Sequence, residues 1–131
     1  MDHDPSYVLL DMATGERAAF ESKFLERNGH PVHVCNGPGD STCPILAGTG
    51  CELFDSAHGV IFQLDLDRPA HRAILATYRE AAGDELPIRV VVEPRQAEEY
   101  GDLLTNFEVW THEPSVADLD GFAAEVEAAE R

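Results

Sequence analysis

Short apolar runs alternate with segments of helical periodicity along this chain. Five runs predict strands, at Tyr7–Asp11, Val32–Cys35, Val60–Asp65, Ile88–Val92 and Phe107–Trp110. Apolar residues that recur every three or four positions predict helices at Glu16–Asn28, Ala70–Ala82, Pro94–Leu104 and from Ser115 onward. The first helix is predicted to stop at Gly29, and Ser115 with Asp118 forms a capping-box variant at the start of the last. The pattern therefore reads β-α-β-loop-β-α-β-α-β-α.

Strands that alternate with helices indicate a parallel sheet joined by right-handed crossovers. With five strands, the simplest arrangement is a flavodoxin-like α/β three-layer sandwich with strand order 2-1-3-4-5. Residues 36–57 are rich in Gly, Pro, Ser and Thr and are predicted to form a loop in place of the second helix. At 131 residues, we expect a single domain spanning 1–131.

The stretch VIFQLDLDRP, residues 60–69, carries the strongest chemical signal. Its predicted strand ends in Asp65, and Pro69 follows four positions later, where it suits the first turn of a helix. Ligands of open α/β sheets bind at the carboxyl ends of the strands, so Asp65 is a candidate for chemistry. The ordinary alternative is that Asp65, or Asp67 beside it, caps the helix and shapes the loop.

Four features in this order resemble a response-regulator receiver domain of two-component signal transduction. The first strand ends in Asp11, the third in Asp65-x-x-x-Pro69, a helix follows the fourth, and the fifth ends in THEP, residues 111–114. The resemblance implies that Asp65 accepts a phosphoryl group from a histidine kinase. It also implies a Mg²⁺ site formed by the carboxylates of Asp11 and Asp65 and the backbone carbonyl of Asp67, since a hard cation with oxygen ligands screens the carboxylate nucleophile.

The chain departs from the receiver pattern at the positions that read out phosphorylation. Met12 stands where a second acid is usual, Val92 or Glu93 replaces the switch hydroxyl, and His112 or Glu113 replaces the lysine. Neither Val92 nor Glu93 donates a hydroxyl hydrogen bond, and a carboxylate repels a phosphoryl group. We therefore expect an atypical, non-enzymatic receiver-like domain that regulates through protein–protein contacts without standard phosphorylation switching.

The three cysteines are evenly spaced within residues 35–51, at Cys35, Cys43 and Cys51, and His33 and His58 flank them. Thiolates and imidazole could bind zinc, and three thiolates could begin an iron–sulfur site, although the chain has no C-x2-C knuckle. A reversible disulfide, most easily Cys43–Cys51, and plain packing of small side chains are the other possibilities. These cysteines give an alternative function, a thiol-redox or metal-binding sensor.

The chain carries 25 acidic and 9 basic residues, a formal charge of −16. Such a surface repels nucleic-acid phosphate and anionic lipid, so we expect a protein partner, such as a histidine kinase or another regulator, and neither nucleic acid nor membrane. The N-terminus has no basic segment before an apolar run, so no signal peptide is predicted and the cytoplasm is the expected location. His71 is expected to be exposed, and Phe107 and Trp110 to lie in the core.

Overall fold

A computed structural model describes residues 7–12, 16–35, 57–82, 86–105 and 107–129. Its five strands form one parallel sheet in the order β2-β1-β3-β4-β5, which confirms the predicted order. The strands are β1 Val8–Asp11, β2 Val32–Cys35, β3 Gly59–Phe62, β4 Ile88–Val91 and β5 Glu108–Trp110. Cys43, Cys51 and the predicted loop from residue 36 to 56 lie outside the described residues.

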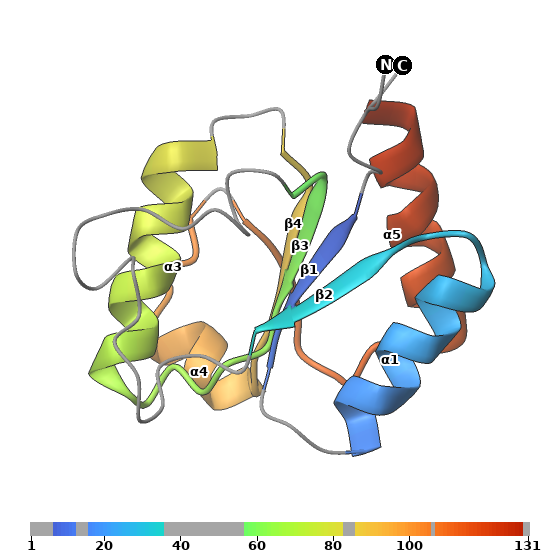
Figure 1. Ribbon diagram of the computed structural model, residues 1–131. Coiled ribbons are helices and arrows are strands. Elements are labelled where there is room, and N and C mark those ends of the chain that lie inside the picture. The colour runs from blue at the N-terminus through green and yellow to red at the C-terminus, as the bar shows by residue number, and fades with distance from the viewer. Residues whose placement is uncertain (1–6, 13–15, 36–56, 83–85, 106, 130–131) are drawn as a thin grey trace.

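The helices form the two outer layers of a sandwich. They are α1 Glu16–Arg27, α3 Pro69–Ala82, α4 Pro94–Glu99 and α5 Val116–Ala129. Helices α1 and α5 cover one face of the sheet, and α3 and α4 lie on the other (Figure 1). The predicted flavodoxin-like α/β fold is therefore confirmed. Within the described segments, no helix has the length and apolar character needed to span a membrane.

Both faces of the central strands are buried, which is why their sequences are almost continuously apolar. On β1, Leu9 joins the core cluster beneath α3, whereas Val8 and Leu10 join the cluster beneath α1 and α5. Phe107 and Trp110 are each half-buried against these two clusters, as expected. The protein therefore has two hydrophobic cores, one on each face of the sheet. Because the strands are parallel, the residues that follow them all lie at the carboxyl edge of the sheet.

The predicted helix ends are confirmed where local chemistry decides them. Gly29 has a φ of 85°, and the N–H of His30 donates to the carbonyl of Leu25 at 2.9 Å, which closes α1 as a left-handed cap does. At the start of α5, the Ser115 N–H donates to Asp118 at 3.0 Å and the Asp118 N–H donates back to Ser115 at 3.2 Å. This reciprocal pair is the predicted capping arrangement.

Three local expectations were wrong. β3 ends at Phe62 rather than at Asp65, because the last ladder bond runs from the Gln63 N–H to the Asp11 carbonyl and the chain then turns. α4 ends at Glu99 rather than at residue 104, where Gly101 and turns follow. His71 is 5% exposed, because its Nδ1 lies 2.7 Å from the carbonyl oxygen of Asp65 and this contact draws the ring inward.

Candidate functional site at the carboxyl edge of the sheet

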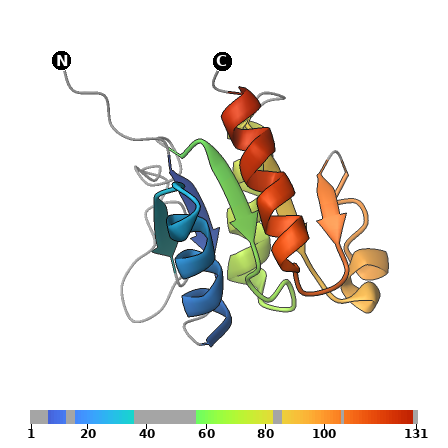
Figure 2. The same cartoon turned by 90° about the vertical axis from the view of Figure 1, so that its right-hand side faces the viewer.

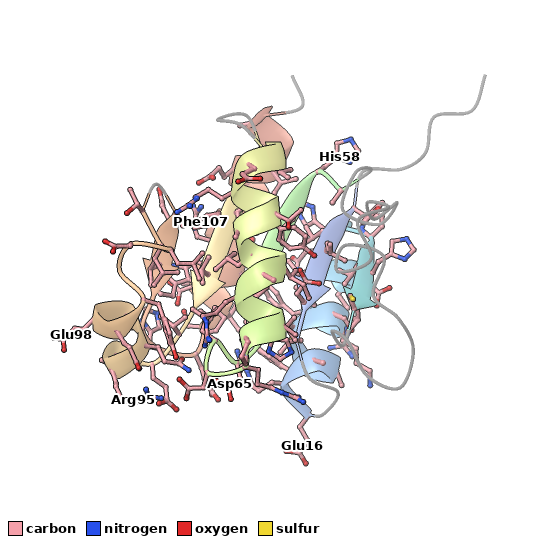
Figure 3. All side chains as sticks on the ribbon, turned by 90° about the vertical axis from the view of Figure 1, so that its left-hand side faces the viewer. Glu16, His58, Asp65, Arg95, Glu98 and Phe107 are labelled. Carbon is pink, nitrogen blue, oxygen red and sulfur yellow. The ribbon has the colours of Figure 1, made fainter. Side chains whose placement is uncertain are left out.

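A cleft of about 490 Å³ lies at the carboxyl ends of β3, β4 and β5. Parallel strands bring their following loops to one edge, so residues far apart in sequence line the same space. Six residues singled out from the sequence meet here, namely Asp65, Asp67, Val92, Glu93, His112 and Glu113. Gln63, Gln96 and Thr111 are among the other lining residues. Asp65 and Arg95 lie at this edge in Figure 3.

Asp65 is exposed, and its carboxylate organises the loop between β3 and α3. Its Oδ1 accepts hydrogen bonds from the Asp67 N–H at 3.0 Å and from Nε2 of Gln96 at 2.9 Å. The first bond is the turn that an aspartate makes with the backbone two residues on. The ordinary loop-forming role therefore has direct geometric support, and the carboxylate also faces the cleft.

Asp67 is tied to α4 rather than to the sheet. Its Oδ2 accepts from Arg95 at 2.7 Å and its Oδ1 accepts from the Tyr100 hydroxyl at 2.9 Å. These hydrogen bonds, that from Arg95 first, lower the pKa of Asp67 below its ordinary value. Arg95 also pairs with Glu99 at 2.7 Å. The Arg95 guanidinium is thus already engaged by two carboxylates.

Gln96 connects the two walls of the cleft. Its side chain is 6% exposed, with Nε2 donating to Asp65 and Oε1 accepting from the Glu93 N–H at 3.2 Å. Glu93 precedes α4, so this amide would otherwise lack a partner in the helix. One buried amide side chain therefore joins the Asp65 turn to the first turn of α4.

Asp11 lies apart from the cleft, beneath α3, and is fully buried. Burial raises its pKa to about 6, and the side chains of Tyr78 and Cys35 offset part of this increase. The Tyr78 hydroxyl and the Cys35 thiol therefore lie close enough to this carboxylate to favour its charged form.

Of the residues expected to hold Mg²⁺, Asp65 and Asp67 lie together in the cleft. Asp11 is absent from the residues that line the cleft with Asp65 and Asp67. Among the described residues, no group of three His, Cys, Asp or Glu side chains is arranged to hold a metal ion. The Mg²⁺ site stays a prediction from the resemblance.

Sequence reasoning missed a buried polar network on the other face of the sheet. Glu21 of α1 is fully buried and accepts from Nε2 of Gln63 at 2.6 Å and from Arg17 at 2.9 Å. Arg17 also donates to the Pro114 carbonyl at 2.7 Å. Burial is the main cause that raises the pKa of Glu21, and Glu113 raises it further. This network holds α1, the end of β3 and the loop before α5 together.

The helical periodicity of the sequence indicates that Glu21 is buried. It falls on the buried face of α1 between Ala18 and Leu25, at the spacing where only apolar residues are expected. In the sequence, Gln63 is the polar residue that interrupts the run VIFQL. In the structure Gln63 directly follows β3 and its N–H makes the last ladder bond, to the Asp11 carbonyl, whereas Asp65 lies two residues further on.

The cysteine and histidine candidates fall at different levels of the sheet. Cys35 is half-buried and pairs in register with Asp11 at the carboxyl end, and His33 lies two residues before it against the Tyr7 ring at 4.4 Å. His58 lies at the opposite edge (Figure 3), where its N–H donates to the Tyr7 carbonyl at 2.9 Å. His58 and Cys35 are thus separated by about 13 Å along the strands, at roughly 3.3 Å per residue.

His112 and Glu113 stand on the loop after β5, and both are exposed. His112 pairs with Asp118 at 3.0 Å. The pKa of Asp118 is lowered first by the Ser115 backbone N–H and next by His112. The His112 ring is therefore directed to the start of α5, and the nearby carboxylate of Glu113 adds negative charge to the cleft.

Comparison with known proteins gives the fold. No family model matches the chain, and no curated protein matches its sequence. A solved structure that is similar is the response regulator RPA3017 in red light signaling of R. palustris, with a TM-score of 0.52 and 13% sequence identity over 90% of each chain. The chain shares the α/β fold of this response regulator. At 13% identity the likeness shows the fold alone and says nothing of the chemistry of the cleft.

Proposed function

We propose that this chain is an atypical receiver-like signalling or regulatory domain that acts through protein–protein contacts, without standard phosphorylation switching and without catalysis of its own. The observation that carries the proposal is the charge of the cleft. Asp65 and Asp67 share it with two more carboxylates, Glu93 and Glu113. The receiver pattern has a hydroxyl at Val92 or Glu93 and a lysine at His112 or Glu113. Its partner would be a protein, such as a histidine kinase or another regulator.

Electrostatics supports this mode of action. A phosphoryl group on Asp65 would add about two negative charges to a space already lined by carboxylates. Arg95 does not offset them, since its guanidinium is bound to Asp67 and Glu99. Val92 has no hydroxyl that could donate a hydrogen bond to the phosphoryl oxygens. Phosphorylated Asp65 would therefore form slowly, and the cleft would have no hydroxyl or lysine to bind the phosphoryl group.

Treatment with acetyl phosphate or beryllofluoride in the presence of Mg²⁺ tests the proposal. We expect no adduct on Asp65 by intact-protein mass spectrometry, and no shift of the α4 backbone amides in nuclear magnetic resonance spectra. A phosphorylation-competent receiver domain is the positive control for the reagents. The double variant Val92→Thr/Glu113→Lys supplies the missing hydroxyl and cation, and we expect it to gain measurable binding that is lost again when Asp65→Asn is added. Stoichiometric modification of wild-type Asp65 that moves the α4 amides would overturn the proposal.

A thiol-redox or metal-binding sensor is the second candidate function. It is favoured by the position of Cys35, half-buried at the carboxyl end of β2 and in register with the buried Asp11. If it holds, free-thiol titration will count fewer thiols after mild oxidation than after reduction, or freshly purified protein will contain zinc or iron. Three thiols in both states, with no bound metal, would exclude it. Cys35→Ser identifies the contribution of this residue.

A further inference from the structure

The Glu21 carboxylate is a buried charge in the layer formed by α1 and α5. These two helices lie side by side on one face of the sheet and are in contact (Figure 2). Glu21 belongs to the side of α1 that packs inward, and it is fully buried. Removing a carboxylate from water is costly, and an apolar residue at this position would serve packing alone as well or better. The connections of Glu21, rather than packing, must therefore explain it.

Glu21 joins two segments that line the cleft. Its Oε1 accepts a hydrogen bond from Nε2 of Gln63 at 2.6 Å, and Gln63 is a lining residue directly after β3. Its Oε2 accepts from Nη2 of Arg17 at 2.9 Å, and the same nitrogen donates to the Pro114 carbonyl at 2.7 Å. Pro114 directly follows Glu113, which also lines the cleft. One carboxylate on α1 therefore connects the end of β3 with the loop after β5.

Both partners of Glu21 are donors, so this arrangement requires the charged carboxylate. An ionised carboxylate only accepts hydrogen bonds, and each of its two oxygens accepts one here. A protonated Glu21 gains an O–H group, and a buried O–H needs an acceptor. The Arg17 guanidinium has no acceptor atom, whereas Gln63 offers its Oε1 once its amide group turns over. Protonation would therefore weaken the bond to Arg17 and reverse the Gln63 amide.

The groups around Glu21 link its proton to the charge of the cleft. Burial is the largest cause that raises the pKa of Glu21, Arg17 lowers it, and Glu113 in the cleft raises it further. The contacts at the ends of β1 and β3 are neutral, since Gln63 donates to Glu21 and also to Sδ of Met12 at 3.7 Å. Coupling between two sites is reciprocal. Negative charge added to the cleft therefore favours proton uptake by Glu21, and a cation near Glu113 favours its ionised form.

We propose that Glu21 is a proton-controlled link between the cleft and the α1–α5 layer. In its ionised form it holds the Gln63 amide and, through Arg17, the loop that carries Pro114. Its protonation turns the amide over and loosens the hold of Arg17 on the loop. The state of the link follows both pH and the charge in the cleft. It needs neither phosphorylation nor a partner, so its test is independent of the function proposed above.

A nuclear magnetic resonance titration of the full chain from about pH 3 to pH 8 tests the link. It follows the Glu21 carboxyl carbon, the Gln63 side-chain amide and the Ser115 backbone amide, whose nitrogen is bonded to the Pro114 carbonyl carbon. We expect all three signals to shift with one midpoint above 4.5, the ordinary pKa of a glutamate. Asp118, which accepts from the Ser115 N–H, has a pKa below 3.8, so its effect on that amide is separate.

Three variants divide the link into its parts. Glu21→Gln should abolish the shared titration of the Gln63 and Ser115 amides. Glu26→Gln, which changes an exposed acid on the same helix, is the matched control and should leave that titration as in wild type. Glu113→Gln removes an exposed charge from the cleft. We expect it to lower the Glu21 midpoint by about half a pH unit, less than the one to three units that a charge in direct contact produces.

The loop after β5 contains another titratable group, His112, which pairs with Asp118. Its own protonation would move the Ser115 amide, so each titration is repeated with His112→Gln. A Ser115 shift that persists in Glu21→Gln would overturn the proposal, as would a Glu21 midpoint at or below 4.5. Glu113 is exposed, so Glu113→Gln is expected to fold whatever Glu21→Gln does. An unchanged Glu21 midpoint in Glu113→Gln would exclude the link to the cleft.

Discussion

The variant Asp11→Asn is expected to be more stable than wild type by about 3 kcal/mol at neutral pH. Asp11 is fully buried, and burial raises its pKa from 3.8 to about 6. At roughly 1.36 kcal/mol for each pKa unit, the buried charge costs about 3 kcal/mol once the carboxyl is ionised. Asparagine has nearly the same shape and never carries that charge.

The advantage of Asp11→Asn depends on pH with a defined sign. Between pH 3.8 and about 6 the folded protein holds the Asp11 proton and the unfolded chain releases it, so this group lowers stability as pH rises. The difference between variant and wild type should therefore be below about 1 kcal/mol near pH 4 and reach its plateau above pH 6. Urea unfolding across this range measures it. Asp120→Asn removes one exposed charge and is the control, and a difference that does not vary with pH would contradict the prediction.

A second large effect is expected at Gly59, the first residue of β3. A Cβ atom there would lie 2.5 Å from Cγ2 of Val126 and 3.1 Å from Cζ of Phe122, both side chains of α5. Overpacking of this kind typically costs about 1–3 kcal/mol. Glycine has no positive φ at this position, so the cost of Gly59→Ala comes from the close approach of helix and strand rather than from backbone strain.

A double-mutant cycle separates this contact from general damage. Val126→Ala alone should be less stable than wild type because it leaves a cavity. In the double variant Gly59→Ala/Val126→Ala, the loss in the free energy of unfolding should be smaller than the sum of the two single losses, by about 1 kcal/mol or more. Gly101→Ala is the control, since a Cβ atom at Gly101 would lie 3.6 Å from its nearest neighbours, which is an ordinary contact distance. Strictly additive losses at Gly59 and Val126 would show that the helix and strand are not in this close contact.

The strand order was predictable because burial on both faces leaves a strong trace in a sequence. Each central strand is a short apolar run, and alternation with helices leaves few topologies for five strands. The end of β3 was not predictable, because Gln63, Leu64 and Asp65 continue an apolar-looking run. Only the Asx turn of Asp65 and the last ladder bond to Asp11 decide where the strand stops. Such endings depend on side-chain bonds that periodicity does not record.

The candidate site was predictable in position but not in its connections. The edge of a parallel sheet gathers Asp65, Glu93 and Glu113 whatever their chemistry, so topology alone placed them together. Glu21 and Gln96 could not be assigned partners, because their hydrogen bonds join residues 42 and 31 positions apart in sequence. The Mg²⁺ site and the roles of Cys43 and Cys51 stay predictions.

The Gln96 bridge also gives the protein an internal spectroscopic probe. Its side chain contacts the Asp65 carboxylate at one end and the Glu93 amide proton at the other. Any event that withdraws the carboxylate from Gln96, such as esterification of Asp65 or capture of that oxygen by a cation, will alter the electron density around the Glu93 proton. The chemical shift and exchange rate of this single amide therefore report the state of Asp65 without a label in the cleft.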